Sequence, residues 1–105
     1  MTRADQLRNM APQLVADVRL YSVADGGRTS TAYPGWGCPC MVSNGQPLAN
    51  GWDAWPLLDG TTLEPGAKRR LGFVFMSDEG LELMRAAGRF YLWEGGFIGE
   101  ATVVG

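Results

Sequence analysis

Hydrophobic and polar residues alternate along three segments of the chain, and this period of two predicts β-strands. The alternation runs from Leu14 to Tyr21, returns from Lys68 to Phe75, and occurs again on both sides of Gly95-Gly96. Because successive side chains of a strand point to opposite faces, each segment has one face suited to a core. In the first segment that face carries Leu14, Ala16, Val18 and Leu20.

Two shorter apolar segments add strands to this set. They run from Cys38 to Val42 and from Trp52 to Pro56. Pro39 restricts the first of them to an edge strand or to a strand start, because proline lacks a backbone N–H. Between them, Asn44-Gly45 and Asn50-Gly51 are dipeptides typical of hairpin turns. The whole pattern therefore predicts about six short strands.

The last two strands are predicted to form a hairpin with a two-residue turn at Gly95-Gly96. Such a turn sets a register that pairs Phe90 with Ala101 and Trp93 with Ile98. In this register Phe90 faces the core and Trp93 points outward.

One helix of about three turns is predicted between Ser77 and Gly88. Ser77 can cap its start, and Asp78 and Glu79 lie at the positive end of the helix dipole. Gly88 is suited to the residue that follows the last helical turn. Residues 1–13 are predicted to be a flexible or helical N-terminal tail, and residues 14–105 a single all-β domain with one short inserted helix.

Composition narrows the classes of function. The 105 residues carry a net charge of −2, which disfavours a nucleic-acid binder, and there is no histidine. A serine–histidine–aspartate triad is therefore excluded, and no phosphate-binding loop is present. We expect no catalysis and no cofactor. With no secretory leader and no run of about 20 apolar residues, we expect a cytoplasmic protein without a membrane span.

Cys38 and Cys40 form the one chemically unusual motif. Two thiolates one residue apart suit a soft metal or thiol exchange. A tetrahedral zinc site needs two further ligands, which without histidine must be carboxylates or come from a second chain. Two small buried side chains beside a turn are the favoured interpretation, so we expect no metal.

Four tryptophans and one basic grouping are the remaining candidates for binding. Trp52 and Trp55 are predicted to lie in the core, whereas Trp36 and Trp93 suit a core or a binding surface equally well. Arg28 and the run from Lys68 to Arg70 are cations that can meet a phosphate backbone or lie at solvated strand ends.

The order and spacing of several short motifs resemble the C-terminal β-barrel of translation elongation factor Tu. These motifs, which together extend over about nine tenths of the chain, are Val18-Arg19-Leu20-Tyr21, Gly26-Gly27-Arg28, Gly35-Trp36, Pro65-Gly66, Arg89-Phe90, Glu94-Gly95-Gly96 and Val103-Val104. Asp25 and Trp36 stand where the family has glutamate and tyrosine. We expect a stand-alone barrel, without the GTPase domain and the middle barrel of the factor.

The resemblance implies a closed, six-stranded antiparallel barrel without catalysis. The family's domain contacts the T arm of aminoacyl-tRNA and the other domains of the factor, which makes Arg28, Ser30 and Gly96 candidate binding residues. The family's arginine after the Gly-Tyr pair is lost in Gly37-Cys38-Pro39-Cys40, and Phe97 replaces a basic residue.

The sequence as a whole predicts a non-catalytic module that binds a protein partner, with a role related to translation. Its predicted binding residues are Arg28, Ser30, Trp36, Trp93 and Gly96. Two alternatives stay open. One is RNA or ribosome-associated binding through the Arg28 side, and the other is thiol-redox or metal chemistry at Cys38 and Cys40.

Overall fold

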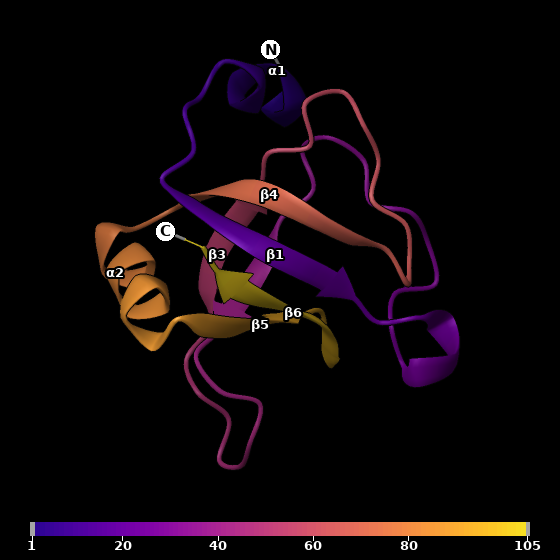
Figure 1. Cartoon of the computed structure of the whole chain (residues 1–105), viewed down its shortest axis with the longest axis vertical. Helices are drawn as coiled ribbons and strands as arrows, with labels where there is room; N and C mark the ends of the chain where they lie inside the picture. The colour runs from indigo at the N-terminus through magenta and orange to yellow at the C-terminus, as the bar shows by residue number, and fades with distance from the viewer. Residues whose placement is uncertain (1, 105) are drawn as a thin grey trace.

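A computed structural model describes residues 2–104 and shows a closed barrel of six antiparallel strands (Figure 1). The strands are β1 (Leu14–Leu20), β2 (Cys38–Met41), β3 (Trp52–Pro56), β4 (Lys68–Phe75), β5 (Arg89–Trp93) and β6 (Phe97–Val103), and the helices are α1 (Arg3–Arg8), the short 3₁₀ helix η1 (Val23–Asp25) and α2 (Asp78–Ala87). Around the barrel the order is β1-β4-β3-β2-β5-β6, and β6 pairs back onto β1. The predicted six-stranded fold is confirmed.

The barrel interior is filled by the apolar faces of the strands, as their period of two predicts. All four inward residues of β1 are buried, and so are Leu71, Phe73 and Phe75 of β4. Three phenylalanines form the centre of the core. The ring of Phe90 meets that of Phe73 edge-on, with centroids 5.4 Å apart, and lies 6.2 Å from that of Phe75.

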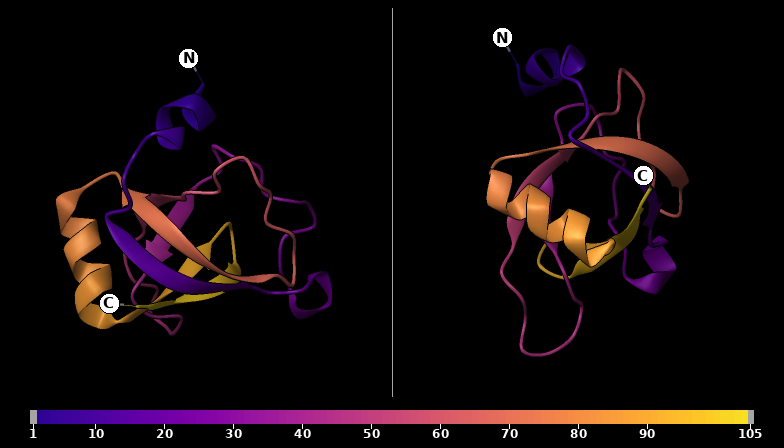
Figure 2. Two further views of the ribbon diagram at one scale, coloured as in Figure 1. Left: turned by 45° about the horizontal axis from the view of Figure 1, so that its top comes forward. Right: turned by 60° about the vertical axis from the view of Figure 1, so that its left-hand side comes forward.

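A second, smaller cluster lies outside the barrel, where α1 packs against β3 and β4 (Figure 2). Leu7 of α1 is buried there with Leu57 and Val74, and Trp55 packs against them. The guanidinium of Arg3 lies 4.3 Å from the Trp55 ring. The prediction of Trp55 as a residue of the barrel core is therefore wrong, because α1 covers an outward position and makes a second apolar contact there.

Helix α2 has the predicted bounds and lies across one end of the barrel (Figure 2). The Ser77 hydroxyl accepts a hydrogen bond from the Gly80 N–H at 3.1 Å. At the other end, Gly88 has a φ of 73° and donates its N–H to the Met84 carbonyl at 3.1 Å. Buried Leu81 and Met84 attach the helix to the core.

The final hairpin differs from the prediction in its register. Phe90 pairs with Ala101 as expected, but Trp93 pairs with Phe97, and residues 94–96 form a three-residue connection. Ile98 is the extra residue of a β-bulge, and its side chain packs into the core. A strictly regular strand would not bring the side chains of Ile98 and Ala101 to the same inner face, so burial of the isoleucine favours the bulge.

The β2–β3 region also departs from expectation. Neither Asn44-Gly45 nor Asn50-Gly51 closes a two-residue hairpin, since residues 42–51 form one long loop that projects from the barrel (Figure 1). Strand β2 lies between β3 and β5 and is not an edge strand. Pro39 is tolerated near the strand start because it lies opposite Asp53 of β3, and pairing with β5 begins only at Cys40.

Candidate functional site

The predicted binding residues lie mainly at the end of the barrel opposite α2, where the β1–β2 connection meets the β5–β6 turn (Figure 1). The two segments are joined near this end by a hydrogen bond from the Tyr21 N–H to the Ile98 carbonyl at 2.8 Å. Residues about 60–80 positions apart in sequence are thus neighbours.

Two glycines turn the chain back toward the barrel immediately before Arg28. Gly26 ends η1 with a φ of 89°. Gly27 donates its N–H to the Ser22 carbonyl at 2.8 Å, and a Cβ at this residue would lie 2.0 Å from the Tyr21 carbonyl oxygen. Only glycine fits such a close backbone approach, and the approach places Arg28 beside the end of β1.

Arg28, Ser30, Trp36 and Glu94 form one group, called here the Arg28 cluster. Arg28 Nε lies 3.3 Å from Glu94 Oε1, and Trp36 Nε1 donates a hydrogen bond to Glu94 Oε2 at 2.9 Å. The guanidinium of Arg28 lies 4.9 Å from the Trp36 ring, and Nη2 donates to Ser30 Oγ at 3.3 Å. The Arg28 side chain is only 14% exposed. Its guanidinium is therefore held between an indole and a carboxylate and does not project into solvent.

The other two predicted residues lie next to this cluster on the last hairpin. The Gly96 carbonyl accepts a hydrogen bond from the Glu94 N–H at 2.9 Å. Trp93 is half-buried on the outer face, and its ring meets that of Phe97 at 4.9 Å. The Tyr91 and Phe97 rings lie 6.1 Å apart. Tyr91, Trp93 and Phe97 thus make an aromatic strip on the outer face of the hairpin.

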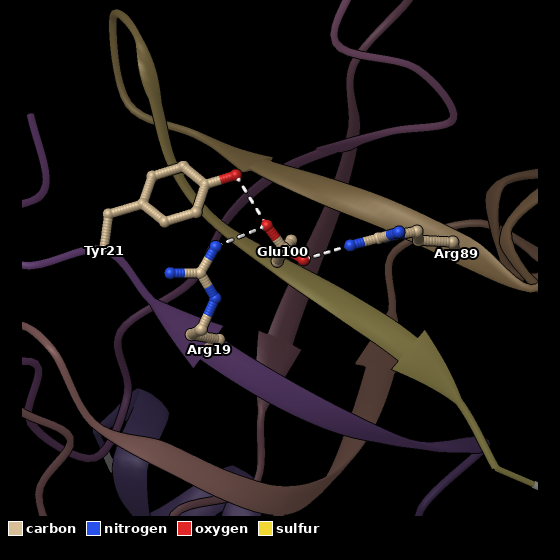
Figure 3. Close-up of polar contacts among 4 residues, drawn as sticks. All are labelled: Arg19, Tyr21, Arg89 and Glu100. Atoms are coloured by element: carbon tan, nitrogen blue, oxygen red, sulfur yellow. Dashed lines mark hydrogen bonds and ion pairs between the residues drawn. The ribbon is translucent and has the colours of Figure 1, made fainter. Parts of the chain in front are cut away.

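Glu100 is the centre of a second polar group, which sequence reasoning missed (Figure 3). Its Oε1 accepts hydrogen bonds from Arg19 Nη2 at 2.9 Å and from the Tyr21 hydroxyl at 3.1 Å. Its Oε2 accepts a hydrogen bond from Arg89 Nη2. The Glu100 side chain is 17% exposed, so three donors enclose one carboxylate on the outer face of the sheet.

Burial of Glu100 acts to raise its pKa, but the hydrogen bonds from Arg89, Tyr21 and Arg19 outweigh this effect and lower the pKa below its ordinary value. Conversely, burial and the hydrogen bond to Glu100 raise the pKa of Tyr21. At neutral pH the group therefore holds an ionised carboxylate, two guanidiniums and a neutral phenol.

A shallow hollow of about 410 Å³ lies beside Glu100 on the outer face of β4, β1 and β6. Its charged lining residues are Asp17, Arg19, Lys68, Arg69, Arg70 and Glu100. Asp17 binds Arg70, with Nε 2.8 Å from Oδ1, and this contact lowers the pKa of Asp17. The run from Lys68 to Arg70 thus lines a hollow that does not include Arg28.

The two cysteines are buried on the inner side of β2. Both are free thiols, and Cys40 Sγ lies 3.9 Å from the Cys38 carbonyl oxygen. The hydrogen bond with the Cys38 side chain, together with burial and the charge of Asp53, raises the pKa of Cys40 well above its ordinary value. This environment disfavours the thiolate needed for redox or metal chemistry. Among residues 2–104, no three histidine, cysteine or acidic side chains are placed to share a metal ion.

We expect both thiols to react slowly with an alkylating reagent in the native protein. Replacing both cysteines by alanine should lower the free energy of unfolding by about 1–2 kcal/mol, because two buried side chains lose their packing. Mass spectrometry after brief alkylation, with urea-unfolded protein as the fully labelled control, measures the first effect. Rapid labelling of the folded protein, or a mass increment of one zinc ion, would contradict the structural role of the thiols.

A comparison with models of known protein families finds no match, and a comparison with curated protein sequences likewise finds no relative. Within the described part of the chain, no helix has the length and apolarity required to cross a bilayer.

Sequence reasoning grouped Arg28, Ser30 and Trp36 but missed the two acids that organise the sites, Glu94 and Glu100. For Glu94 a signal existed, since it belongs to the Glu94-Gly95-Gly96 motif. For Glu100 the signal was its position opposite Tyr91 in the hairpin, which places both side chains on the outer face.

Proposed function

We propose that the chain is a non-catalytic binding module for a protein partner, with the aromatic strip and the adjoining Arg28 cluster as the interface. The observation that carries the proposal is the gathering of three half-buried aromatic rings on the outer face of one hairpin, beside the contact of Arg28 with Trp36 in the β1–β2 connection. Tryptophan, tyrosine and arginine are enriched at the energetic centres of protein interfaces. A role related to translation and a cytoplasmic location complete the proposal, and both rest on the sequence alone.

Kinship with the C-terminal barrel of elongation factor Tu is part of the same proposal. It is supported by the motif order and by the contact between the Gly26-Gly27-Arg28 turn and the Glu94-Gly95-Gly96 turn. The absence of histidine and of a phosphate-binding loop in the sequence supports a non-catalytic role.

The two rival hypotheses have less support. RNA binding through the Arg28 side requires a guanidinium open to phosphate, whereas Arg28 is largely buried against Glu94. Thiol or metal chemistry requires an accessible thiolate, whereas Cys38 and Cys40 are buried.

The double variant Trp93→Ala, Phe97→Ala is expected to reduce capture of the partner about tenfold or more, because it removes two aromatic anchors. Quantitative mass spectrometry of proteins captured from extract of the source cells measures this effect. Leu83→Ala is the matched control, since Leu83 is exposed on α2 at the other end of the barrel. Thermal unfolding of each variant confirms that the barrel is intact.

Two results would contradict the proposal. One is a captured protein that the double variant retains as well as Leu83→Ala does. The other is the failure of wild-type protein to enrich any protein over beads that carry no bait.

A further inference from the structure

We propose that the outer face of β4, β1, β6 and β5 binds an acidic segment of the partner protein. This inference rests on the proposed function, because the segment belongs to that partner. The surface, called here the basic face, is defined by its outward charged residues Lys68, Arg70, Asp17, Arg19, Glu100 and Arg89.

The basic face has an excess of positive charge in an acidic protein. It holds four of the nine cationic residues of the chain and only two of its eleven acidic residues. Its formal charge is therefore +2, and since the whole chain carries −2, the remainder carries −4. A charge separation of this size directs an anionic partner to this face.

The excess positive charge lowers the stability of the sheet through repulsion between like charges. Arg19 lies directly opposite Lys68 in the β1–β4 pair, and like charges in directly opposed positions destabilise a sheet. Glu100 is shared between Arg19 and Arg89, so one carboxylate serves two guanidiniums. Among residues 2–104, no carboxylate forms an ion pair with Lys68. The chain's own carboxylates neutralise these cations only in part, and an anionic ligand would offset the repulsion that remains.

The spacing of the cations suits an extended peptide. Lys68 and Arg70 occupy alternate positions of β4, and alternate side chains of a strand lie about 6.8 Å apart. A peptide in extended conformation presents acids at alternate positions with the same repeat. The hollow of about 410 Å³ between these side chains and those of β1 and β6 gives such carboxylates room to approach. Guanidinium groups bind carboxylates through paired hydrogen bonds, which adds orientation to the charge attraction.

A short acidic peptide fits this surface better than a nucleic acid does. Asp17 and Glu100 lie within the basic face, and a continuous phosphate backbone would pass over both. A peptide can place uncharged residues at those points. The face also adjoins the aromatic strip, since the Arg89 guanidinium lies 5.9 Å from the Tyr91 ring. An apolar residue beside the acids would contact that strip, so one segment can use both surfaces.

A fluorescent octapeptide with glutamate at alternate positions and one terminal phenylalanine is a suitable probe. Its control has glutamine in place of each glutamate. Fluorescence anisotropy at 50 mM salt should show binding of the glutamate peptide. The glutamine peptide should bind with an affinity at least about tenfold lower. Binding should weaken at 200 mM salt, because exposed charges are screened. Equal binding of the two peptides would overturn the inference.

Two variants of the basic face should change the affinity in opposite directions. Lys68→Glu is expected to weaken binding about fivefold, and Asp17→Asn, which frees Arg70, to strengthen it about threefold. Lys68→Glu places a carboxylate opposite Arg19 and so does not weaken the sheet. Arg8→Glu makes the same change of charge on α1 and is expected to leave the affinity unchanged. An equal loss of affinity in Arg8→Glu and Lys68→Glu would contradict a site on the basic face.

The same anisotropy titration with a fluorescent octauridylate tests whether the basic face binds nucleic acid. If the octauridylate binds more tightly than the glutamate peptide, the inference is wrong. Suppose that the Trp93→Ala, Phe97→Ala variant loses the partner but the wild-type protein does not bind the glutamate peptide. This result would support the proposed function and refute the present inference. Peptide binding that depends on Lys68, with no protein captured from extract, would refute the proposed function and retain the anionic site.

Discussion

Replacement of Phe90 by alanine is expected to lower the free energy of unfolding by about 3–5 kcal/mol. The side chain is fully buried and packs against the rings of Phe73 and Phe75 at the centre of the barrel. The strands around it are hydrogen-bonded into a closed ring, which limits how far they can move inward to fill the cavity. Urea unfolding followed by tryptophan fluorescence measures the change.

Phe97→Ala is the matched control, because it removes the same side chain from the outer face of the same hairpin. Phe97 is half-buried and makes edge contacts with Tyr91 and Trp93. Its loss should therefore cost only about 1–2 kcal/mol. Equal destabilisation by the two substitutions would mean that Phe90 does not occupy the centre of the core.

Gly27→Ala is expected to lower the free energy of unfolding by about 1–3 kcal/mol. The added methyl group would lie 2.0 Å from the Tyr21 carbonyl oxygen and 2.9 Å from that of Ser22. Both obstacles are backbone atoms, so the turn must move as a unit and take Arg28 away from the Trp36 ring. A change in native tryptophan fluorescence should accompany the loss of stability measured by urea unfolding.

Gly45→Ala supplies the reference for this substitution. Gly45 lies in the projecting loop, has no positive φ, and an added Cβ there meets nothing within 4 Å. Its replacement should change stability by less than about 0.5 kcal/mol. A Gly27→Ala protein as stable as Gly45→Ala would contradict the close approach of this turn to β1.

Sequence reasoning succeeded where the determining interactions are local. Helix α2 has its predicted bounds because Ser77 and Gly88 satisfy its ends within a few residues. Strands β1, β4, β5 and β6 followed from the period of two, and β2 and β3 from short apolar runs. The bulge at Ile98 could not be derived in this way, because it depends on the core that the isoleucine enters. The position of Trp55 likewise depends on α1, which packs against it from a distant part of the chain.

In the candidate sites, too, local motifs could be recognised in the sequence, whereas contacts between distant strands could not. Arg28 and Trp36 were found because their turns carry recognisable motifs. The role of Glu100 depends on the pairing of β1 with β6, since only that neighbour relation brings Arg19 to the carboxylate. Alternation shows which residues face outward, but strand order decides which of them meet.

The pairing of β1 with β6 also determines how the barrel is completed. Asp17 lies opposite Thr102, so the β1–β6 pairing joins residues that are 85 positions apart in the sequence. Contacts of such long range form slowly, and this seam is suited to be the last pairing made. A sheet in which it has not yet formed has two bare edges, which pair readily with strands of other chains. The hydrogen bonds that complete the ring therefore also protect the protein from aggregation through its strands.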